Sequence, residues 1–207
     1  MTLSVTFARK QIPIGVAMLP CVTLVRHGET QWSASGQHTG RTDIPLTEEG
    51  ERKARGLKKR LKGVAFDRVF TSPLQRARRT CELAGFGERA KVDPDLLEWN
   101  YGDYEGRKTS EILSERPGWL LFRDGCPNGE QPADVGARAD RVIGRLRAAD
   151  DRAIVFSSGH ILRVVAARWL GLAPSEGRLF MLGTASISIL GYEHDKGEPA
   201  VQLWNEI

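Results

Sequence analysis

The stretch CVTLVRHGET, residues 21–30, decides the fold of this chain. Its first half, CVTLV, is a short run rich in β-branched residues with a glycine just beyond it, which is typical of a buried strand. Its second half places Arg26 and His27 directly past the end of that strand. In sheets whose strands alternate with helices, active sites lie at the carboxyl ends of the strands. The stretch therefore predicts a strand of the core and part of a functional site.

Outward from this stretch, strand patterns alternate with helix patterns. Further strands are expected over residues 68–72, 153–157, 186–190 and 201–204, and helices over 47–60, 72–84, about 135–146 and 160–170. This alternation predicts an α/β protein with three layers, in which a mainly parallel sheet carries helices on both faces. We find no internal repeat, low-complexity tract or linker, so residues 20–207 are expected to form a single domain.

Capping residues mark the start of two of these helices. Thr47 is expected to cap the first, with acidic side chains in its first turn and basic ones in its last. Ser72, Pro73 and Gln75 have the spacing of an N-cap, a proline at the first helical position and a capping-box partner. That spacing predicts that the second helix begins at Ser72.

Composition excludes several classes of protein. The 207 residues are 41% hydrophobic and carry a formal net charge of +4, which is too mild to indicate a nucleic-acid or anionic-membrane partner. No apolar run reaches the roughly 18 residues of a membrane span. Three scattered cysteines and the absence of short Cys or His spacings predict reduced thiols in a cytoplasmic protein, with no zinc site. Residues 1–19 contain no acidic side chain and are interrupted by Pro13 and Gly15, so we expect a poorly ordered N-terminal extension there.

Four short segments place reactive side chains where strands end or beside such ends. They contain Arg26 with His27, Arg76, Glu98, and the run Ser157-Ser158-Gly159-His160. Arginine presents a planar fork that matches phosphate oxygens, and helix N-termini also favour anions. A histidine nucleophile needs one ring nitrogen protonated and the other free, and the turn at Gly28 can bring a backbone carbonyl to hold that proton. Each feature is weak alone, but together they indicate a site for a phosphoryl group.

These segments resemble the signature of the histidine phosphatase superfamily, which includes phosphoglycerate mutases and many small phosphatases. The resemblance covers about residues 21–206 and implies a phosphoglycerate mutase-like fold. It is closest to the branch of acid phosphatases and sedoheptulose-bisphosphatase-type sugar phosphatases. The matching segments are LVRHGET (24–30), TGRTDIPLTEEGERKA (39–54), TSPLQRARRT (71–80), LLEWNYGDYEG (96–106) and GWLLFRDGCPNGE (118–130).

The resemblance assigns a role to each reactive residue. His27 matches the nucleophile that becomes phosphohistidine, and Arg26 and Arg76 match the arginines that clamp the phosphoryl oxygens. Glu98 matches the acid that protonates the leaving oxygen and then activates water. No metal or other cofactor is implied, because the arginines neutralise the phosphoryl charge.

Other positions match residues that contact substrate. Thr39 and Gly40 match a pair that touches substrate in the mutases. Trp99 and Tyr101 are expected either to wall the pocket or simply to pack. His38 lies in the loop before Thr39, and the sequence leaves open whether it contacts substrate or water.

One position departs from the family pattern. The second catalytic histidine usually lies five residues before an arginine, and counting back from Arg163 that position holds Ser158. We expect His160 to compensate from the start of its helix, or else Ser158 to supply a weaker hydroxyl contact to the phosphoryl group. A charged His160 ring would strengthen the clamp, so activity would fall as the pH rises through its pKa.

The sequence favours a phosphomonoesterase that hydrolyses a small phosphorylated metabolite, such as a sugar phosphate or bisphosphate. The alternatives are a phosphoglycerate mutase and an impaired module that only binds phosphorylated ligands. The segment from Glu98 to Ser158 lacks the pair of adjacent arginines that the mutases use, and an intact His27 and Glu98 argue against a pure binding role. The sequence does not indicate the substrate itself, nor whether the chain forms a homo-oligomer.

Overall fold

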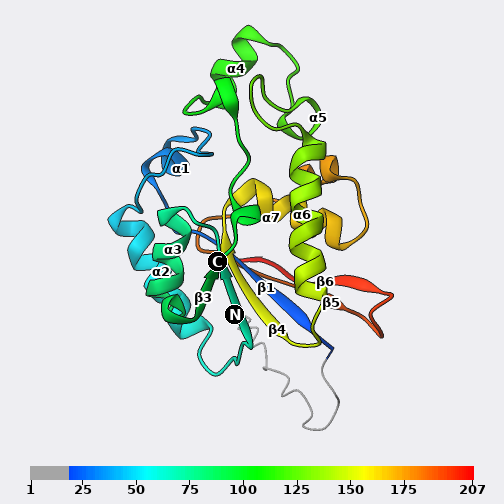
Figure 1. Cartoon of the computed structure of the whole chain (residues 1–207). Helices are drawn as coiled ribbons and strands as arrows, with labels where there is room; N and C mark the ends of the chain where they lie inside the picture. Colours follow the sequence, from blue (N-terminus) through cyan, green and yellow to red (C-terminus); the bar gives the residue numbers. More distant parts are fainter. Residues whose placement is uncertain (1–18) are drawn as a thin grey trace, which may run out of the picture.

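Strand β1 (Cys21–Arg26) lies inside a six-stranded sheet whose strand order is β3-β2-β4-β1-β5-β6. The computed structural model describes residues 19–207 and is drawn in Figure 1. Strand β1 pairs in parallel with β4 (Arg152–Ser157) and antiparallel with β5 (Ile187–Tyr192). The remaining strands are β2 (Arg68–Thr71), β3 (Ala90–Val92) and β6 (Pro199–Glu206). The sheet is therefore mainly parallel, as predicted, with β5 alone running opposite to the other described strands and pairing antiparallel with β1 and with β6.

The sheet has a hydrophobic core on each face, which makes the molecule three-layered. Because successive strand residues point to opposite faces, Val155 joins one core while Ile154 and Phe156 join the other. Helices α6 (Pro132–Arg147) and α7 (Gly159–Trp169) pack on the first core, and α2 (Glu48–Arg60) and α3 (Gln75–Leu83) pack on the second. The predicted doubly covered sheet is confirmed.

The two capping predictions have different outcomes. Thr47 caps α2, and its side chain accepts a hydrogen bond from the Gly50 amide at 3.0 Å. The prediction for Ser72 is wrong, because α3 begins at Gln75 with Leu74 at the cap position and no side-chain cap bond. The backbone of Ser72 remains hydrogen-bonded to the sheet, because its amide donates to the Phe156 carbonyl at 2.9 Å. The strand end therefore holds Ser72 out of the helix.

A long segment between β3 and α6 rises over the carboxyl edge of the parallel strands (Figure 1). It contains four short helices. They are η2 (Pro94–Leu96), η3 (Gly102–Tyr104), α4 (Thr109–Glu115) and α5 (Leu121–Asp124). Helix α1 (Gln31–Ser35) lies across from it, and a backbone bridge between Gln37 and Lys108 joins the two regions. These segments enclose the space above the sheet edge.

The remaining described elements are short. They are η1 (Gly87–Arg89) and η4 (Pro174–Leu179), which follow α3 and α7 along the chain. Within residues 19–207 there is no helix with the length and apolar character needed to cross a membrane. The extension expected over residues 1–19 lies outside the described residues except for Leu19, which packs against the core.

Candidate active site

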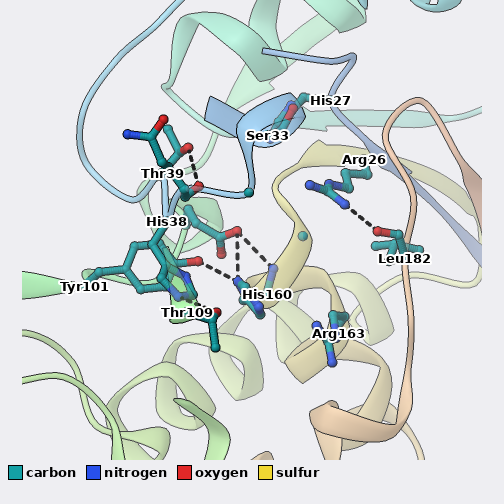
Figure 2. Close-up of a pocket in the computed structure, with 14 residues that line it drawn as sticks. Arg26, His27, Ser33, His38, Thr39, Tyr101, Thr109, His160, Arg163 and Leu182 are labelled. Carbon is teal, nitrogen blue, oxygen red and sulfur yellow. Dashed lines mark hydrogen bonds and ion pairs between the residues drawn. The ribbon is translucent and has the colours of Figure 1, made fainter. Parts of the chain in front are cut away.

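A cavity of about 250 Å³ opens at the carboxyl edge of the parallel strands, where the sequence predicted a site. Strand β1 leads into Arg26 and His27, and β4 leads through Ser158 into α7. Figure 2 shows side chains from these elements and from the overlying segment turned towards one space. The cavity is lined by Arg26, His27, Ser33, Gly36, Gln37, His38, Thr39, Glu98, Tyr101, Thr109, Gly159, His160, Arg163 and Leu182.

The His27 ring is held in one tautomer by its neighbour in the chain. Its Nδ1 lies 2.6 Å from the Gly28 carbonyl oxygen, which only accepts hydrogen bonds, so Nδ1 carries the proton and Nε2 has a free lone pair. Burial lowers the pKa of His27 well below its ordinary value, and the charges of Arg76 and Arg26 lower it further. The ring is therefore neutral near pH 7 and its Nε2 is available as a nucleophile.

The turn that holds His27 depends on two glycines in contact. A Cβ atom on Gly28 would lie 2.5 Å from the Gly50 carbonyl oxygen, and one on Gly50 would lie 2.1 Å from the Glu29 carbonyl oxygen. Neither approach leaves room for a side chain. The first turn of α2 therefore packs directly on the loop that follows β1, and this packing positions His27 above the sheet edge.

Arg26 keeps part of its guanidinium free. Its Nη1 donates to the Leu182 carbonyl, which belongs to the loop before β5. Its buried Nε has no hydrogen-bond partner among the described residues. The guanidinium also lies against Gly159, where a Cβ would be 3.3 Å from its Cζ. A buried donor without a partner is costly, so this atom is suited to an anionic ligand in the cavity.

Arg76 is fully buried and its guanidinium is fixed by backbone carbonyls. Nη1 donates to the Thr42 carbonyl at 3.0 Å, and Nη2 donates to the Thr39 and Gly40 carbonyls at 2.9 and 2.8 Å. Nε lies 3.4 Å from the Ser158 hydroxyl, a long contact. Since a guanidinium has five N–H groups, one Nη1 proton and the weakly engaged Nε remain for a ligand.

Glu98 is buried and lies at the start of α7. Its Oε1 accepts hydrogen bonds from the Trp99 and Ile161 amides at 2.9 and 2.8 Å, and its Oε2 accepts one from the His160 amide at 2.9 Å. The amides of His160 and Ile161 at the start of α7 are of the kind that favours an anion. They are occupied by the Glu98 carboxylate, which they orient towards the cavity.

His160 lines the cavity together with Tyr101, and the two side chains are bonded. The Tyr101 hydroxyl lies 2.5 Å from His160 Nδ1, and burial raises the pKa of Tyr101, so we assign the phenol as the donor. This assignment leaves the proton of the neutral ring on Nε2. Burial lowers the pKa of His160 well below its ordinary value, so the charged ring expected from the sequence is disfavoured. Figure 2 shows His160 beside Tyr101, on the side of the cavity away from His27.

The outer part of the cavity contains residues that sequence reasoning missed or left open. Ser33, Gln37 and Thr109 contribute neutral polar groups, and the His38 ring lies near both Tyr101 and His160, with centroid distances of 4.8 and 6.1 Å. Arg163 adds a guanidinium whose Nε donates to the Gly177 carbonyl at 3.0 Å. The sequence singled out Arg163 only as the arginine that lies five residues after Ser158, and it did not place Arg163 in the site. No local pattern marks a residue that becomes part of a site through a distant loop.

The structure separates the predicted site residues into two groups. Those that line the cavity are Arg26, His27, Thr39, Glu98, Tyr101 and His160. Arg76, Gly40 and Ser158 are buried behind that lining, where the Gly40 carbonyl and the Ser158 hydroxyl both contact Arg76. Trp99 is fully buried and donates from Nε1 to the Glu130 carbonyl at 2.8 Å, so of its two expected roles the structure supports packing. His194, the remaining histidine, is exposed, and its Nδ1 lies 2.7 Å from Glu198 Oε2.

Comparison with known proteins identifies a matching family and several similar chains. The model of the family "Histidine phosphatase superfamily (branch 1)" matches residues 22–207. An acid phosphatase of Mycobacterium tuberculosis is 41% identical over 86% of this chain and 89% of its own length. A sedoheptulose 1,7-bisphosphatase of Saccharomyces cerevisiae is 41% identical over 90% of this chain and 93% of its own length. The solved structure of a Mycobacterium tuberculosis open reading frame superimposes with a TM-score of 0.85 at 37% identity, covering 90% of this chain and 97% of that one.

Proposed function

Since the chain belongs to the histidine phosphatase superfamily, we propose that it is a phosphomonoesterase that hydrolyses small phosphorylated metabolites through a phosphohistidine on His27. The observation that carries this proposal is the state of the His27 ring. Its Nδ1 proton is held by the Gly28 carbonyl at 2.6 Å, its pKa is lowered, and two arginines lie close enough to affect that pKa. A neutral nucleophile beside two fixed cations is suited to attack on a phosphoryl group.

The proposed reaction has two steps. In the first, the lone pair of His27 Nε2 attacks phosphorus, the P–O ester bond breaks, and Glu98 gives its proton to the leaving oxygen. In the second, Glu98 takes a proton from a water molecule, whose oxygen attacks phosphorus, and the P–N bond breaks to release inorganic phosphate and restore His27. Arg26 and Arg76 neutralise the phosphoryl oxygens in both steps. The resemblance implies no metal for this chemistry.

The outer part of the cavity supports a polyhydroxylated leaving group, such as a sugar phosphate or bisphosphate. Hydroxyl, amide and neutral imidazole groups from Ser33, Gln37, His38 and Thr109 can exchange hydrogen bonds with sugar hydroxyls. Arg163 adds a cation at the same cavity, where a second anionic group can be balanced. The name of one relative, a sedoheptulose 1,7-bisphosphatase, supports the same substrate class.

Ser158 remains the departure from the family pattern. Its hydroxyl contacts Arg76 rather than the cavity, while the His160 ring lines the cavity with Nε2 as the proposed donor. We therefore assign to His160 a neutral contact with substrate in place of the charged clamp.

The free cysteines Cys21, Cys81 and Cys126 support the cytoplasmic location that the sequence predicts.

The decisive experiment traps the phosphoenzyme and then identifies the substrate. Brief incubation with a phosphorylated substrate followed by denaturation should leave a base-stable, acid-labile phosphoryl group on the peptide that contains His27. Release of inorganic phosphate should persist in excess chelator. A panel of phosphorylated sugars and of phosphoglycerates then distinguishes the functions. Isomerisation of phosphoglycerate without phosphate release would indicate a mutase, and tight binding without turnover would indicate a binding module.

A further inference from the structure

We propose that Glu105 is a positioning residue for Arg76, acting through the loop of residues 39–42. This inference rests on the proposed function, because it concerns how the phosphoryl clamp is held in place. Glu105 is half-buried in the segment above the sheet edge and does not line the cavity. It was not among the site residues expected from the sequence.

Glu105 holds the loop by its backbone amides. Its Oε1 accepts hydrogen bonds from the Gly40 amide at 2.8 Å and from the Thr42 amide at 3.2 Å. The fit around Gly40 is tight, since a Cβ there would lie 2.5 Å from Glu105 Oε2 and 2.5 Å from the Trp99 carbonyl oxygen. The carboxylate therefore determines where this loop lies relative to the segment above it.

The same loop supplies the carbonyls that hold Arg76. Thr39, Gly40 and Thr42 accept its three short hydrogen bonds, at 2.8 to 3.0 Å. One peptide group serves both partners directly, because the Gly40 amide belongs to the same peptide as the Thr39 carbonyl. That peptide donates to Glu105 and accepts from Arg76, and hydrogen bonds linked in this way polarise and strengthen one another.

Charge balance gives Glu105 a second effect on Arg76. No carboxylate within residues 19–207 forms an ion pair with this buried guanidinium, which donates to three carbonyls and makes one long contact to a hydroxyl. Burial lowers the pKa of Arg76, and the negative charge of Glu105 is among the groups that oppose this shift. A carboxylate one peptide away keeps the cation in place while leaving its remaining N–H groups open to a phosphoryl oxygen.

The test is a double-mutant cycle between Glu105→Ala and Arg76→Ala, measured by the affinity for inorganic phosphate and by kcat/KM with an aryl phosphate. Glu105→Ala should weaken both by about 10- to 100-fold in the wild-type background and by less than about 2-fold when Arg76 is already Ala, because residues in one hydrogen-bond network are not additive. Glu105→Gln, which keeps an oxygen acceptor for the Gly40 amide, should lose less than Glu105→Ala.

A matched control is Glu111→Gln. Glu111 is exposed in the same segment, and its Oε2 also accepts a backbone hydrogen bond, from the Lys108 amide at 2.8 Å. This variant should leave phosphate affinity unchanged. If the effects of Glu105→Ala and Arg76→Ala multiply, Glu105 does not act through Arg76 and the proposal is overturned.

Phosphate binding keeps the two proposals apart. Absence of turnover in the wild-type protein would contradict the proposed function, yet the cycle on phosphate affinity would still test the role of Glu105. If Glu105→Ala fails to fold, the same cycle with Glu105→Gln decides, and equal losses of phosphate affinity in both backgrounds overturn the proposal.

Discussion

His27 is buried, and its surroundings fit chemistry better than core filling. Only 4% of its surface is exposed, but its ring reaches the cavity, and the hydrogen bond that the ring makes is to the carbonyl of the adjacent Gly28. We therefore expect His27→Ala to lower turnover by at least about 1,000-fold, as removal of a nucleophile does, while the protein remains folded. Activity and cooperative thermal unfolding should be measured on the same sample. Loss of the cooperative transition would show that the residue is structural.

We expect the contribution of Glu98 to the rate of hydrolysis to increase with the basicity of the leaving group. An alkoxide needs a proton as it departs, whereas a nitrophenolate hardly does. Glu98→Gln should therefore slow the hydrolysis of a sugar phosphate at least about 10-fold more than that of an aryl phosphate. The comparison of kcat for the two substrates checks this. Equal slowing of both would mean that Glu98 does not act as the acid and that the change disturbs the α7 amides it accepts from.

Ser158 and His160 make different contacts, so their alanine variants should differ. His160→Ala removes a group that lines the cavity and should raise KM several-fold, whereas Ser158→Ala removes only a 3.4 Å contact to Arg76 and should change kcat/KM by less than about 3-fold. Both constants should be measured for each variant with the same sugar phosphate. A larger loss in Ser158→Ala would place the phosphoryl contact at the serine.

Sequence reasoning located the residues that directly follow strand ends and missed those that distant segments bring in. His27 with its Gly28 carbonyl could be predicted because both lie in one short turn. Thr109 could not, because it enters the cavity through α4, a short helix without a long periodic pattern. Glu105 was missed for the same reason, since its partners lie more than one element away along the chain.

Among the helices, α2 offers two glycines that test how closely it packs. A Cβ on Gly50 would lie 2.1 Å from the Glu29 carbonyl oxygen, whereas a Cβ on Gly56 meets nothing within 4 Å. We expect Gly50→Ala to destabilise the protein and to lower activity, because the loop after β1 must move. Gly56→Ala should stabilise it by about 0.5–1 kcal/mol through helix propensity. Urea unfolding of both variants compares them, and equal effects would contradict the close packing described above.

The predicted helix start is correct where the capping residue follows a loop, and it is wrong where the capping residue remains hydrogen-bonded to the sheet. The Thr47 cap is confirmed because that residue follows a loop. The Ser72 cap is wrong because its amide pairs with the Phe156 carbonyl at the end of β4. A capping spacing next to a strand end is therefore ambiguous, since the backbone can continue the sheet instead.

For the whole molecule, the buried histidines couple stability to pH. Burial lowers the pKa values of His27 and His160 well below the ordinary value of 6.5. Between the folded and unfolded pKa values the unfolded chain binds more protons, so the free energy of unfolding decreases as the pH falls below about 6.5 and is unaffected by these groups above it. The urea midpoint should therefore stay constant from about pH 8 to 7 and fall towards pH 5.

The double variant His27→Asn with His160→Asn provides the control for this pH dependence. Without the two rings, the decline of the urea midpoint below about pH 6.5 should be shallower, because fewer protons are taken up on unfolding. An unchanged slope would mean that other groups, such as carboxylates, account for the acid sensitivity.

The position of β1 in the sheet has a consequence for synthesis. Both of its neighbours, β4 and β5, come from the last third of the chain. At about 5–20 residues per second, β4 leaves the ribosome on the order of 10 seconds after β1. During that interval the apolar run CVTLV has neither hydrogen-bonding partner, which makes the nascent chain prone to aggregation. Folding yield in translation should therefore depend on a chaperone that shields residues 21–25 until the second half of the sheet arrives.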